Sequence, residues 1–187
     1  GVGYAISPTG ADHCHNIHDN LYTSQSYFLE EMRSLNITDV LPLTDLSPAK
    51  IRLLKYYSNW IHFLNCAVCC YFVMSLSWVG YERTAHLVRA VTGWNTSVHE
   101  IMTVGERAAN LGRVFDLREG FTRKDDTIPS RFFTGQTSGP LKGVPVDPAA
   151  FEKGLEYYYD MMGWTPKGVP TAGKLGELGI DWVLPPR

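Results

Sequence analysis

Three of the four cysteines, Cys66, Cys69 and Cys70, lie within five consecutive residues in a stretch without charged side chains. Thiolates bind zinc and iron, and the spacing of Cys66 and Cys70 places them on one face of a helix. A tetrahedral zinc site or an iron–sulfur cluster needs four ligands, usually from separated positions, so this run can supply one or two of them. Alternatively, a buried cysteine serves as a small apolar side chain, and we favour that interpretation for Cys66 and Cys69.

A second group of potential ligands is the segment from Asp12 to Asp19, which reads Asp-His-Cys-His-Asn-Ile-His-Asp. Its nitrogen, sulfur and carboxylate donors suit a metal ion, but their spacing matches no zinc motif such as His-Glu-x-x-His. A metal site built from this segment alone is therefore the less favoured hypothesis. We expect a single catalytic histidine instead, because imidazole exchanges a proton near neutral pH.

The third group, from Arg118 to Asp126, mixes guanidinium and carboxylate side chains. Such a run usually forms a solvated face or an internal ion-pair network. Acid–base catalysis by Asp125 or Asp126 would need a raised pKa. The chain contains no phosphate-binding loop, dinucleotide-binding glycine fingerprint or G-x-S-x-G motif.

The composition limits the possible partners and the compartment. The 187 residues include 17 Lys and Arg against 19 Asp and Glu, a net charge of -2, which lacks the basic excess of a nucleic-acid-binding surface. The clustered cysteines do not form a disulfide framework, so we expect a reducing, cytoplasmic compartment. The chain opens on Gly1 without an initiator Met or a secretory signal, and we expect it to be part of a longer protein.

The longest apolar segment runs from Tyr56 to Tyr81 without Lys, Arg, Asp or Glu. A run of roughly 20 apolar residues is long enough to cross a membrane. Polar residues such as Asn59 and His62 interrupt it at several angles around a helix, so we expect a buried helix and no membrane span. Ser47 and Pro48 predict the start of this helix, which is expected to continue through the cysteines until Gly80.

The remaining periodic segments predict further helices. One runs from Tyr81 to Val91, with Ala85, Val88 and Val91 expected on its apolar face, and stops at Gly93. A long one follows the Ser97–Glu100 capping box. The apolar face expected on that long helix consists of Ile101, Val104, Ala108, Leu111 and Phe115. Residues 118–146 predict a long ordered loop, Asp147 and Pro148 begin another helix that ends at Gly163, and Thr171 caps a short turn. No segment alternates with period two, so we predict one all-α, irregular multi-helix domain over residues 1–187.

The long run from Asn110 to Phe132, Asn-Leu-Gly-Arg-Val-Phe-Asp-Leu-Arg-Glu-Gly-Phe-Thr-Arg-Lys-Asp-Asp-Thr-Ile-Pro-Ser-Arg-Phe, resembles the C-terminal signature of tungsten-dependent aldehyde:ferredoxin oxidoreductases. Ser7-Pro-Thr-Gly-Ala-Asp-His13 is similar to that family's S-P-R-G-A-D-H segment, with Thr9 in place of the Arg. The C-terminal residues 157–179 also resemble the family. The resemblance therefore spans nearly the whole chain.

The resemblance implies specific roles for four residues. The family's D-x-x-G-L-C motif, whose Asp contacts a pterin and whose Cys is the fourth ligand of a [4Fe-4S] cluster, corresponds to Asn65-Cys-Ala-Val-Cys-Cys70. Cys70 is then the metal ligand, Asn65 and Asp12 are cofactor-binding candidates, and His13 is the candidate catalytic acid or base. Asn65, Val68 and Cys69 depart from the motif, and Asn65 keeps a carbonyl acceptor while it loses the carboxylate charge.

The leading hypothesis is the C-terminal helical part of an oxidoreductase that oxidises aldehydes or reduces activated acids. A tungsten (or molybdenum) bis-pterin and a [4Fe-4S] cluster are implied for the full-length protein, with none expected on this part alone. The expected partners are the N-terminal cofactor-binding part, ferredoxin or a related electron-transfer protein, and a small aldehyde or acid substrate. The alternatives are a cofactor-free helical interaction module and a small metal-binding protein that uses Asp12 to Asp19 with the cysteines.

Overall fold

The computed structural model describes residues 1–74, 79–139 and 141–183, and these residues form helices and turns. No strand occurs within these ranges, which confirms the all-α prediction. None of the described helices is long and apolar enough to cross a membrane. The α-helices are α1 Val2–Ile6, α2 Tyr27–Glu31, α3 Pro48–Cys66, α4 Tyr71–Met74, α5 Tyr81–Thr92, α6 Val98–Arg118, α7 Pro148–Met162 and α8 Ala172–Glu177. The 3₁₀ turns are η1 His13–His15, η2 Asp19–Tyr22, η3 Met32–Leu35, η4 Arg123–Asp125, η5 Ser130–Phe133 and η6 Asp181–Val183.

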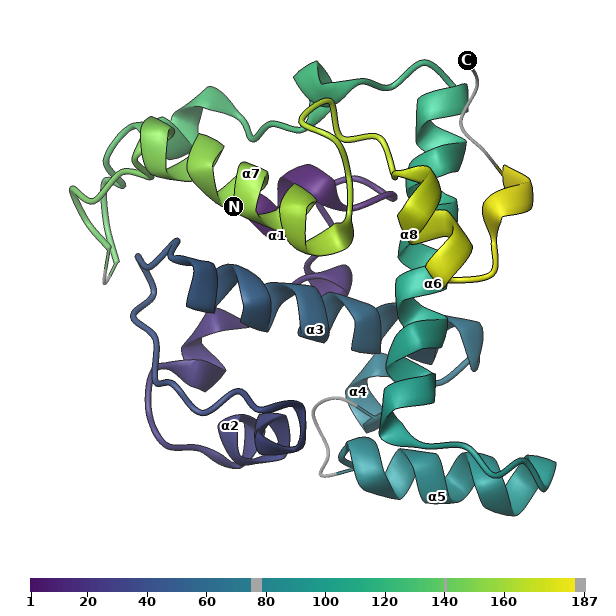
Figure 1. Cartoon of the computed structure of the whole chain (residues 1–187). Coiled ribbons are helices and arrows are strands. Elements are labelled where there is room, and N and C mark those ends of the chain that lie inside the picture. The colour runs from purple at the N-terminus through teal and green to yellow at the C-terminus, as the bar shows by residue number, and fades with distance from the viewer. Residues whose placement is uncertain (75–78, 140, 184–187) are drawn as a thin grey trace.

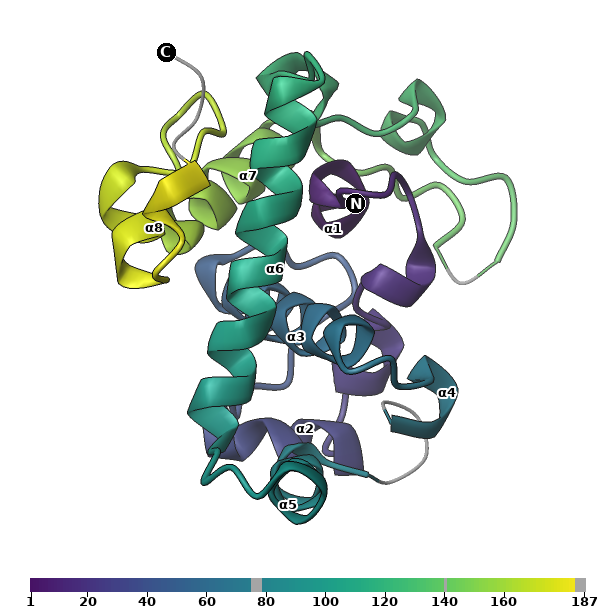
Figure 2. The same cartoon turned by 90° about the vertical axis from the view of Figure 1, so that its right-hand side faces the viewer.

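Helices α3 and α6 cross at the centre of the molecule, and the other elements lie around this crossing (Figure 1). Gly105 lies at the contact point, where an added Cβ would be 1.7 Å from the carbonyl oxygen of Asn59 on α3. A side chain at this position would therefore force the helices apart. Figure 2 shows α6 standing across α3, with α8 and α5 beside different parts of α6.

Three apolar clusters form around this pair of helices. The first joins α3 to α2, α5 and the start of α6, the second joins α3 to α1 and α7, and the third joins the later part of α6 to α8. Helix α3 contributes to two of them because opposite sides of it are buried, through Leu53, Tyr57 and Trp60 on one side and Ile51 and Leu54 on the other. The prediction of a buried helix is confirmed for this segment.

Helix α3 begins as predicted and ends earlier than predicted. The Ser47 side chain accepts a hydrogen bond from the Lys50 amide, and Pro48 occupies the first turn. The helix stops at Cys66, because Val68 adopts a left-handed backbone with φ of 54° and the Cys69 amide bonds to the Leu64 carbonyl. This is the Schellman pattern of helix termination. The predicted continuation through the cysteines is wrong, and Ser75 to Trp78 lie outside the described residues.

The starts of the other helices follow local capping chemistry. Ser97 accepts from the Glu100 amide, Asp147 from the Ala150 amide, and Thr171 from the Lys174 amide. Gly93 and Gly163 end α5 and α7 with positive φ, as predicted. After α6 ends at Arg118, the described residues 119–139 and 141–146 form the expected irregular segment, which contains the two short turns η4 and η5.

The predicted apolar faces of two helices are partly wrong. Val91 on α5 is 85% exposed, and Phe115 on α6 is 62% exposed. Helix α6 instead turns a mixed face inward, because the polar side chains of Asn110 and Arg113 have buried partners. The buried residues of α6 are Ile101, Met102, Gly105, Ala109, Asn110, Arg113 and Val114.

A buried ion pair ties the irregular segment to α6. Two guanidinium nitrogens of Arg113 lie 2.7 and 2.6 Å from the two carboxylate oxygens of Asp126, and Nε of Arg113 donates to the Gly168 carbonyl at 2.7 Å. The Tyr159 hydroxyl also donates to Asp126. Burial opposes the charge on Arg113, but the bonds to Asp126 outweigh it and raise the pKa of Arg113. Of the two interpretations of the run from Arg118 to Asp126, a solvated face or an internal ion-pair network, the second holds for Asp126, although its partner Arg113 precedes the run.

Candidate functional site at the end of helix α3

The three clustered cysteines surround the C-terminal end of α3. Cys66 and Cys70 are exposed, while Cys69 is half-buried and lies against the first apolar cluster. Cys66 is the last residue of α3, and the left-handed backbone of Val68 turns the chain immediately after it. The expectation that Cys66 packs as core is therefore wrong, whereas Cys69 partly meets it. The three thiols do not share one helix face.

A hydrogen-bonded chain joins this helix end to turn η1. Nδ1 of His15 lies 2.7 Å from a carboxylate oxygen of Asp12, and Nε2 of the same ring lies 2.6 Å from the side-chain nitrogen of Asn65. The other Asp12 oxygen accepts from the Cys14 amide at 2.8 Å. These bonds lower the pKa of Asp12, with the Cys14 amide as the largest cause and His15 as the next. The structure thus brings together Asp12 and Asn65, which sequence reasoning had selected separately.

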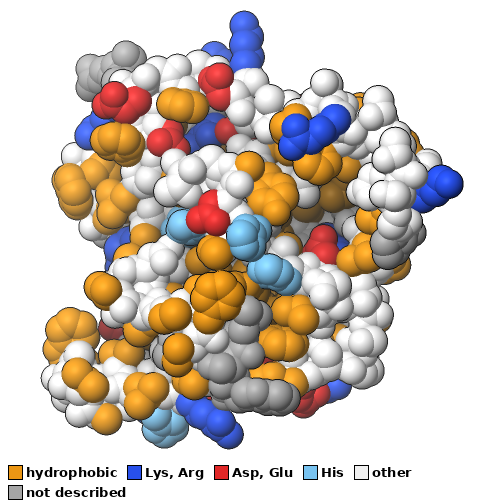
Figure 3. All heavy atoms as spheres, turned by 180° about the vertical axis from the view of Figure 1, so that it is seen from behind, with side chains coloured by type: hydrophobic (Ala, Val, Ile, Leu, Met, Phe, Trp, Pro, Cys, Tyr) orange, Lys and Arg blue, Asp and Glu red, His pale blue; other side chains and the backbone are white. Residues whose placement is uncertain are grey.

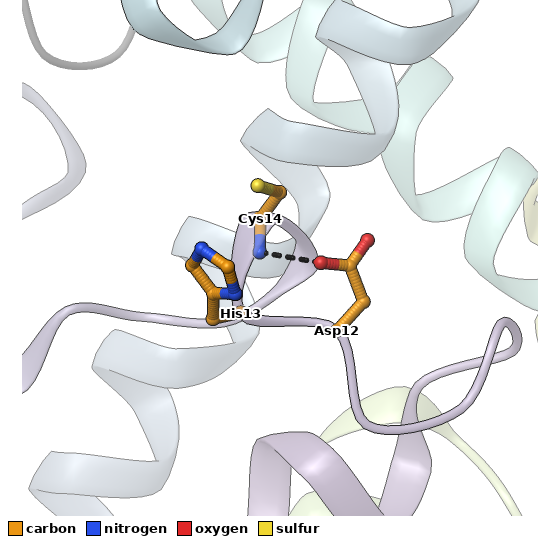
Figure 4. A group of neighbouring side chains, drawn as sticks. All are labelled: Asp12, His13 and Cys14. Carbon is orange, nitrogen blue, oxygen red and sulfur yellow. Dashed lines mark hydrogen bonds between the residues drawn. The ribbon is translucent and has the colours of Figure 1, made fainter.

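His13, the predicted catalytic residue, lies beside this chain without joining it. Its side chain is exposed, and its ring meets that of His18 edge to face, with 6.0 Å between the centroids. Figure 4 shows the His13 ring and the Asp12 carboxylate on opposite sides of the Cys14 backbone nitrogen. His13 is therefore open to a ligand or to water, and its catalytic role stays a prediction.

His15 is the residue that sequence reasoning missed. It stands three positions after Asp12, and side chains three apart eclipse one another in a 3₁₀ turn. That spacing was a usable signal for the bond to Asp12. The contact with Asn65 spans 50 positions in the chain and has no counterpart in the local sequence.

Two further histidines border the site. His62, on α3, is buried, and its ring centroid lies 5.8 Å from that of His15. Burial is the largest cause that lowers the pKa of His62 to about 4, and the charge of nearby His15 is the second. His18 stacks on Tyr71, and its Nε2 is buried with no hydrogen-bond partner among the residues that the structure describes. Figure 3 shows histidine side chains gathered beside an acidic one in the middle of this face, next to hydrophobic side chains.

Among the described residues, one group of three donors is close enough to hold a metal ion: Asp12, His13 and Cys14, whose ligand atoms lie within 4.8 Å of one another. Both Asp12 oxygens already accept hydrogen bonds. Burial, followed by the charge of Asp12, raises the pKa of the Cys14 thiol, which disfavours the thiolate that metals bind. Neither feature favours a mononuclear metal site in this segment.

Asp125 and Asp126 do not have the properties of a general acid. Asp126 is buried against Arg113, and hydrogen bonds from Thr122, first from its amide, lower the pKa of Asp125. A catalytic acid would need the opposite shift. The loop carboxylates are therefore structural.

A cavity of about 650 Å³ lies at the other end of α3, between its first turns, α1 and the segment around residues 131–147. Buried Lys50 lines it and forms an ion pair with Asp19 at 3.2 Å. Lys50 precedes Asn65 by 15 helical positions, which corresponds to about 22 Å along the axis. The cavity lining also includes Asn16 and Ile17, which directly follow His15, so the cavity reaches the segment that carries the His15 cluster.

The sequence of this chain is similar to those of known oxidoreductases. The tungsten-containing aldehyde ferredoxin oxidoreductase of Pyrococcus furiosus is 29% identical to this chain, over 96% of its length. The protein of the same name from Thermococcus kodakarensis is 28% identical, over 98% of the chain. The matched parts make up 27% and 28% of those proteins, so the chain spans little more than a quarter of their length.

A solved structure is also similar in fold: a chain of the active site complex BamBC of benzoyl coenzyme A reductase in complex with 1,5-dienoyl-CoA. The TM-score is 0.55 at 20% identity, over 71% of this chain and 20% of that one. The family described as aldehyde ferredoxin oxidoreductase, domains 2 and 3, matches residues 1–180. Because this match covers almost the entire sequence, the chain belongs to the aldehyde ferredoxin oxidoreductase family.

Proposed function

We propose that this chain is the C-terminal helical part of a tungstopterin and iron–sulfur oxidoreductase that oxidises aldehydes, or reduces activated acids, and passes the electrons to ferredoxin. The match of residues 1–180 to the family carries this proposal. The chain corresponds to little more than a quarter of the curated relatives. We therefore expect it to need an N-terminal cofactor-binding part and to be inactive alone.

Cys70 fits the role of a single cluster ligand. Its thiol is exposed on the loop after α3 and forms no disulfide. No group of three donors that includes Cys70 converges within the described residues. A thiolate in this position suits a [4Fe-4S] cluster whose other ligands come from elsewhere in the protein.

Asn65 and Asp12 fit contacts to a bound cofactor. Asn65 is exposed at the end of α3, close to Cys70 in sequence. Its side-chain N–H group donates a hydrogen bond to His15, and its side-chain carbonyl oxygen is available to accept one. Asp12 is held in place by the Cys14 amide and by His15. Both residues therefore present oriented polar groups on the same face as the cysteine loop.

His13 is the proposed acid or base. A tungsten pterin centre supplies the two-electron chemistry when it is bound, and the protein positions the substrate and manages protons. The exposed imidazole of His13 lies next to Asp12 in the chain, and its ring nitrogens are the atoms that would hold or release the proton.

Exposed apolar side chains near Cys70 support a covering partner. Val68 is 92% exposed and Phe72 is 63% exposed, on the loop and short helix that carry the cysteines. Exposed apolar residues that cluster on one surface are typical of interfaces. We propose that the N-terminal cofactor-binding part packs here. The free cysteines are consistent with a cytoplasmic protein.

The decisive experiment compares two cysteine variants in the holoenzyme. Cys70→Ser is expected to lower the bound iron and to abolish aldehyde-dependent reduction of a dye acceptor, because it removes a cluster ligand. Cys66→Ser is the matched control, since Cys66 is equally a free, exposed cysteine of the same segment. Full iron content and activity in Cys70→Ser would refute the cluster assignment.

A second measurement uses the 187-residue chain alone. It is expected to contain no tungsten, molybdenum or iron after anaerobic purification and to oxidise no aldehyde. Turnover by the isolated chain would show that the remaining part is not required. A holoenzyme without metal would favour the cofactor-free interaction module.

A further inference from the structure

The imidazole of His15 links turn η1 to the last turn of α3, because it contacts both Asp12 and Asn65. Its two ring nitrogens lie 2.7 Å from the Asp12 carboxylate and 2.6 Å from the Asn65 side-chain nitrogen. The ring is only 19% exposed, while Asn65 is exposed. The partly buried ring is thus held at both ends beside an accessible amide.

The chemistry of the three groups determines the direction of both bonds. A carboxylate only accepts hydrogen bonds, so Nδ1 of His15 carries a proton and donates the hydrogen bond to Asp12. In a neutral ring Nε2 then has a lone pair and accepts an N–H from Asn65. The Asn65 carbonyl oxygen must therefore point away from His15.

We infer that His15 is a positioning residue that orients the Asn65 amide, so that the carbonyl oxygen is the atom offered to a bound cofactor. This inference rests on the proposed function for the identity of that cofactor. The oriented oxygen selects a ligand that donates an N–H or O–H, such as an amino group on a heterocycle. Asp12 anchors the arrangement, because the Cys14 amide holds its other oxygen at 2.8 Å.

The residue type at position 65 is matched to this arrangement. An aspartate there has no N–H to donate to Nε2, so its bond to His15 would require a second proton on the ring. Asparagine makes the bond with a neutral ring. His62 faces His15 from α3, with 5.8 Å between the ring centroids, and Thr9 lies 3.4 Å from Nδ1.

The first test measures the His15 tautomer directly in the isotope-labelled 187-residue chain by ¹⁵N NMR at neutral pH. The expected result is a neutral ring with the proton on Nδ1, with contacts between the ring and the Asn65 amide protons. A proton on Nε2 would overturn the inference, because the carbonyl oxygen of Asn65 would then have to face the ring. This measurement needs no variant.

The second test compares His15→Gln with His15→Leu. Glutamine offers one N–H and one carbonyl oxygen and can replace both bonds, whereas leucine fills the space without polar atoms. The Asn65 amide protons are expected to exchange slowly with solvent in the wild type and in His15→Gln, and several-fold faster in His15→Leu. Equal exchange rates in all three proteins would overturn the inference.

The holoenzyme separates this inference from the proposed function. His15→Leu is expected to lose bound pterin and His15→Gln to retain it. Equal pterin content in both variants would overturn the positioning role. If the wild-type holoenzyme binds no pterin at all, the proposed function fails. The orientation of Asn65 is then still tested by the NMR measurements on the 187-residue chain.

Discussion

The Arg113–Asp126 network and the Asp12–His15–Asn65 cluster each contain a carboxylate that is hydrogen-bonded to a nitrogen-bearing side chain, yet they lie in opposite environments. The first is buried between α6, the irregular segment and the turn near Gly168, with two charges in bidentate contact. The second lies at the surface, with an exposed amide at its end. The difference separates side chains that hold the fold from side chains that remain available to a ligand.

The comparison also shows what the family signature does. Arg113 and Asp126 both belong to the run from Asn110 to Phe132, the longest stretch of family resemblance. Asn110 accepts a hydrogen bond from the Trp164 indole nitrogen at 2.8 Å, and the Arg113 guanidinium lies 5.1 Å from the centre of the same ring. The most recognisable motif in the chain is therefore structural, while the candidate chemistry lies in shorter segments.

The largest expected effect comes from breaking the buried network. Arg113→Met leaves the Asp126 carboxylate buried without its cation and is expected to lower the free energy of unfolding by about 3–5 kcal/mol. Urea denaturation measures this change. Glu152→Gln is the control, because it removes an exposed ion pair to Arg123 that is worth about 1 kcal/mol or less. Equal losses in the two variants would show that burial does not distinguish the pairs.

The next prediction concerns His62, a buried residue directly beside the exposed cluster. Burial lowers its pKa from 6.5 to about 4, so below pH 6.5 the unfolded chain binds a proton that the folded chain does not. The free energy of unfolding should therefore fall as the pH drops from 6.5 towards 4, with a contribution of about 3 kcal/mol from this residue.

His62→Phe tests that contribution, because it removes the titrating group and keeps a ring of similar size. Urea denaturation at a series of pH values is expected to show a shallower loss of stability in acid for this variant than for the wild type. Parallel curves would mean that folding does not lower the pKa of His62.

Much of the fold was predictable because helix starts depend on local chemistry. Ser47, Ser97 and Thr171 each accept the amide bond that their sequence position predicts. The inward face of α6 was not predictable from apolar periodicity, because the buried polar residues Asn110 and Arg113 find partners more than ten positions away. The sequence pattern of a single helix does not show which distant residues will contact it.

The site was predictable only in part. The resemblance to the family selected Asp12 and Asn65, and the structure joins them. It did not select His15, since three histidines stand within six positions and only the folded chain shows which of them meets α3. The early end of α3 was also missed, because a valine in a left-handed conformation is not a recognised stop signal.

The smallest expected effect is a gain in stability at that helix end. Val68 has φ of 54° and is 92% exposed, so its side chain contributes little packing while its backbone is strained. The left-handed conformation costs an L-residue roughly 1–2 kcal/mol. Glycine removes that cost but gives up roughly 0.5–1 kcal/mol through the greater entropy of the unfolded chain. Val68→Gly is therefore expected to raise the free energy of unfolding by about 1 kcal/mol or less.

Val91→Gly is the matched control, because Val91 is also exposed but lies inside the right-handed helix α5. The same exchange there removes a better helix former and should lose up to about 0.5 kcal/mol. Urea denaturation of the two variants should give changes of opposite sign. If both lose stability, then the strain at Val68 is relieved in solution, and the short span between Asn65 and Cys70 adopts another backbone there. The orientation of Asn65 would then depend on His15 alone, without support from a rigid helix end.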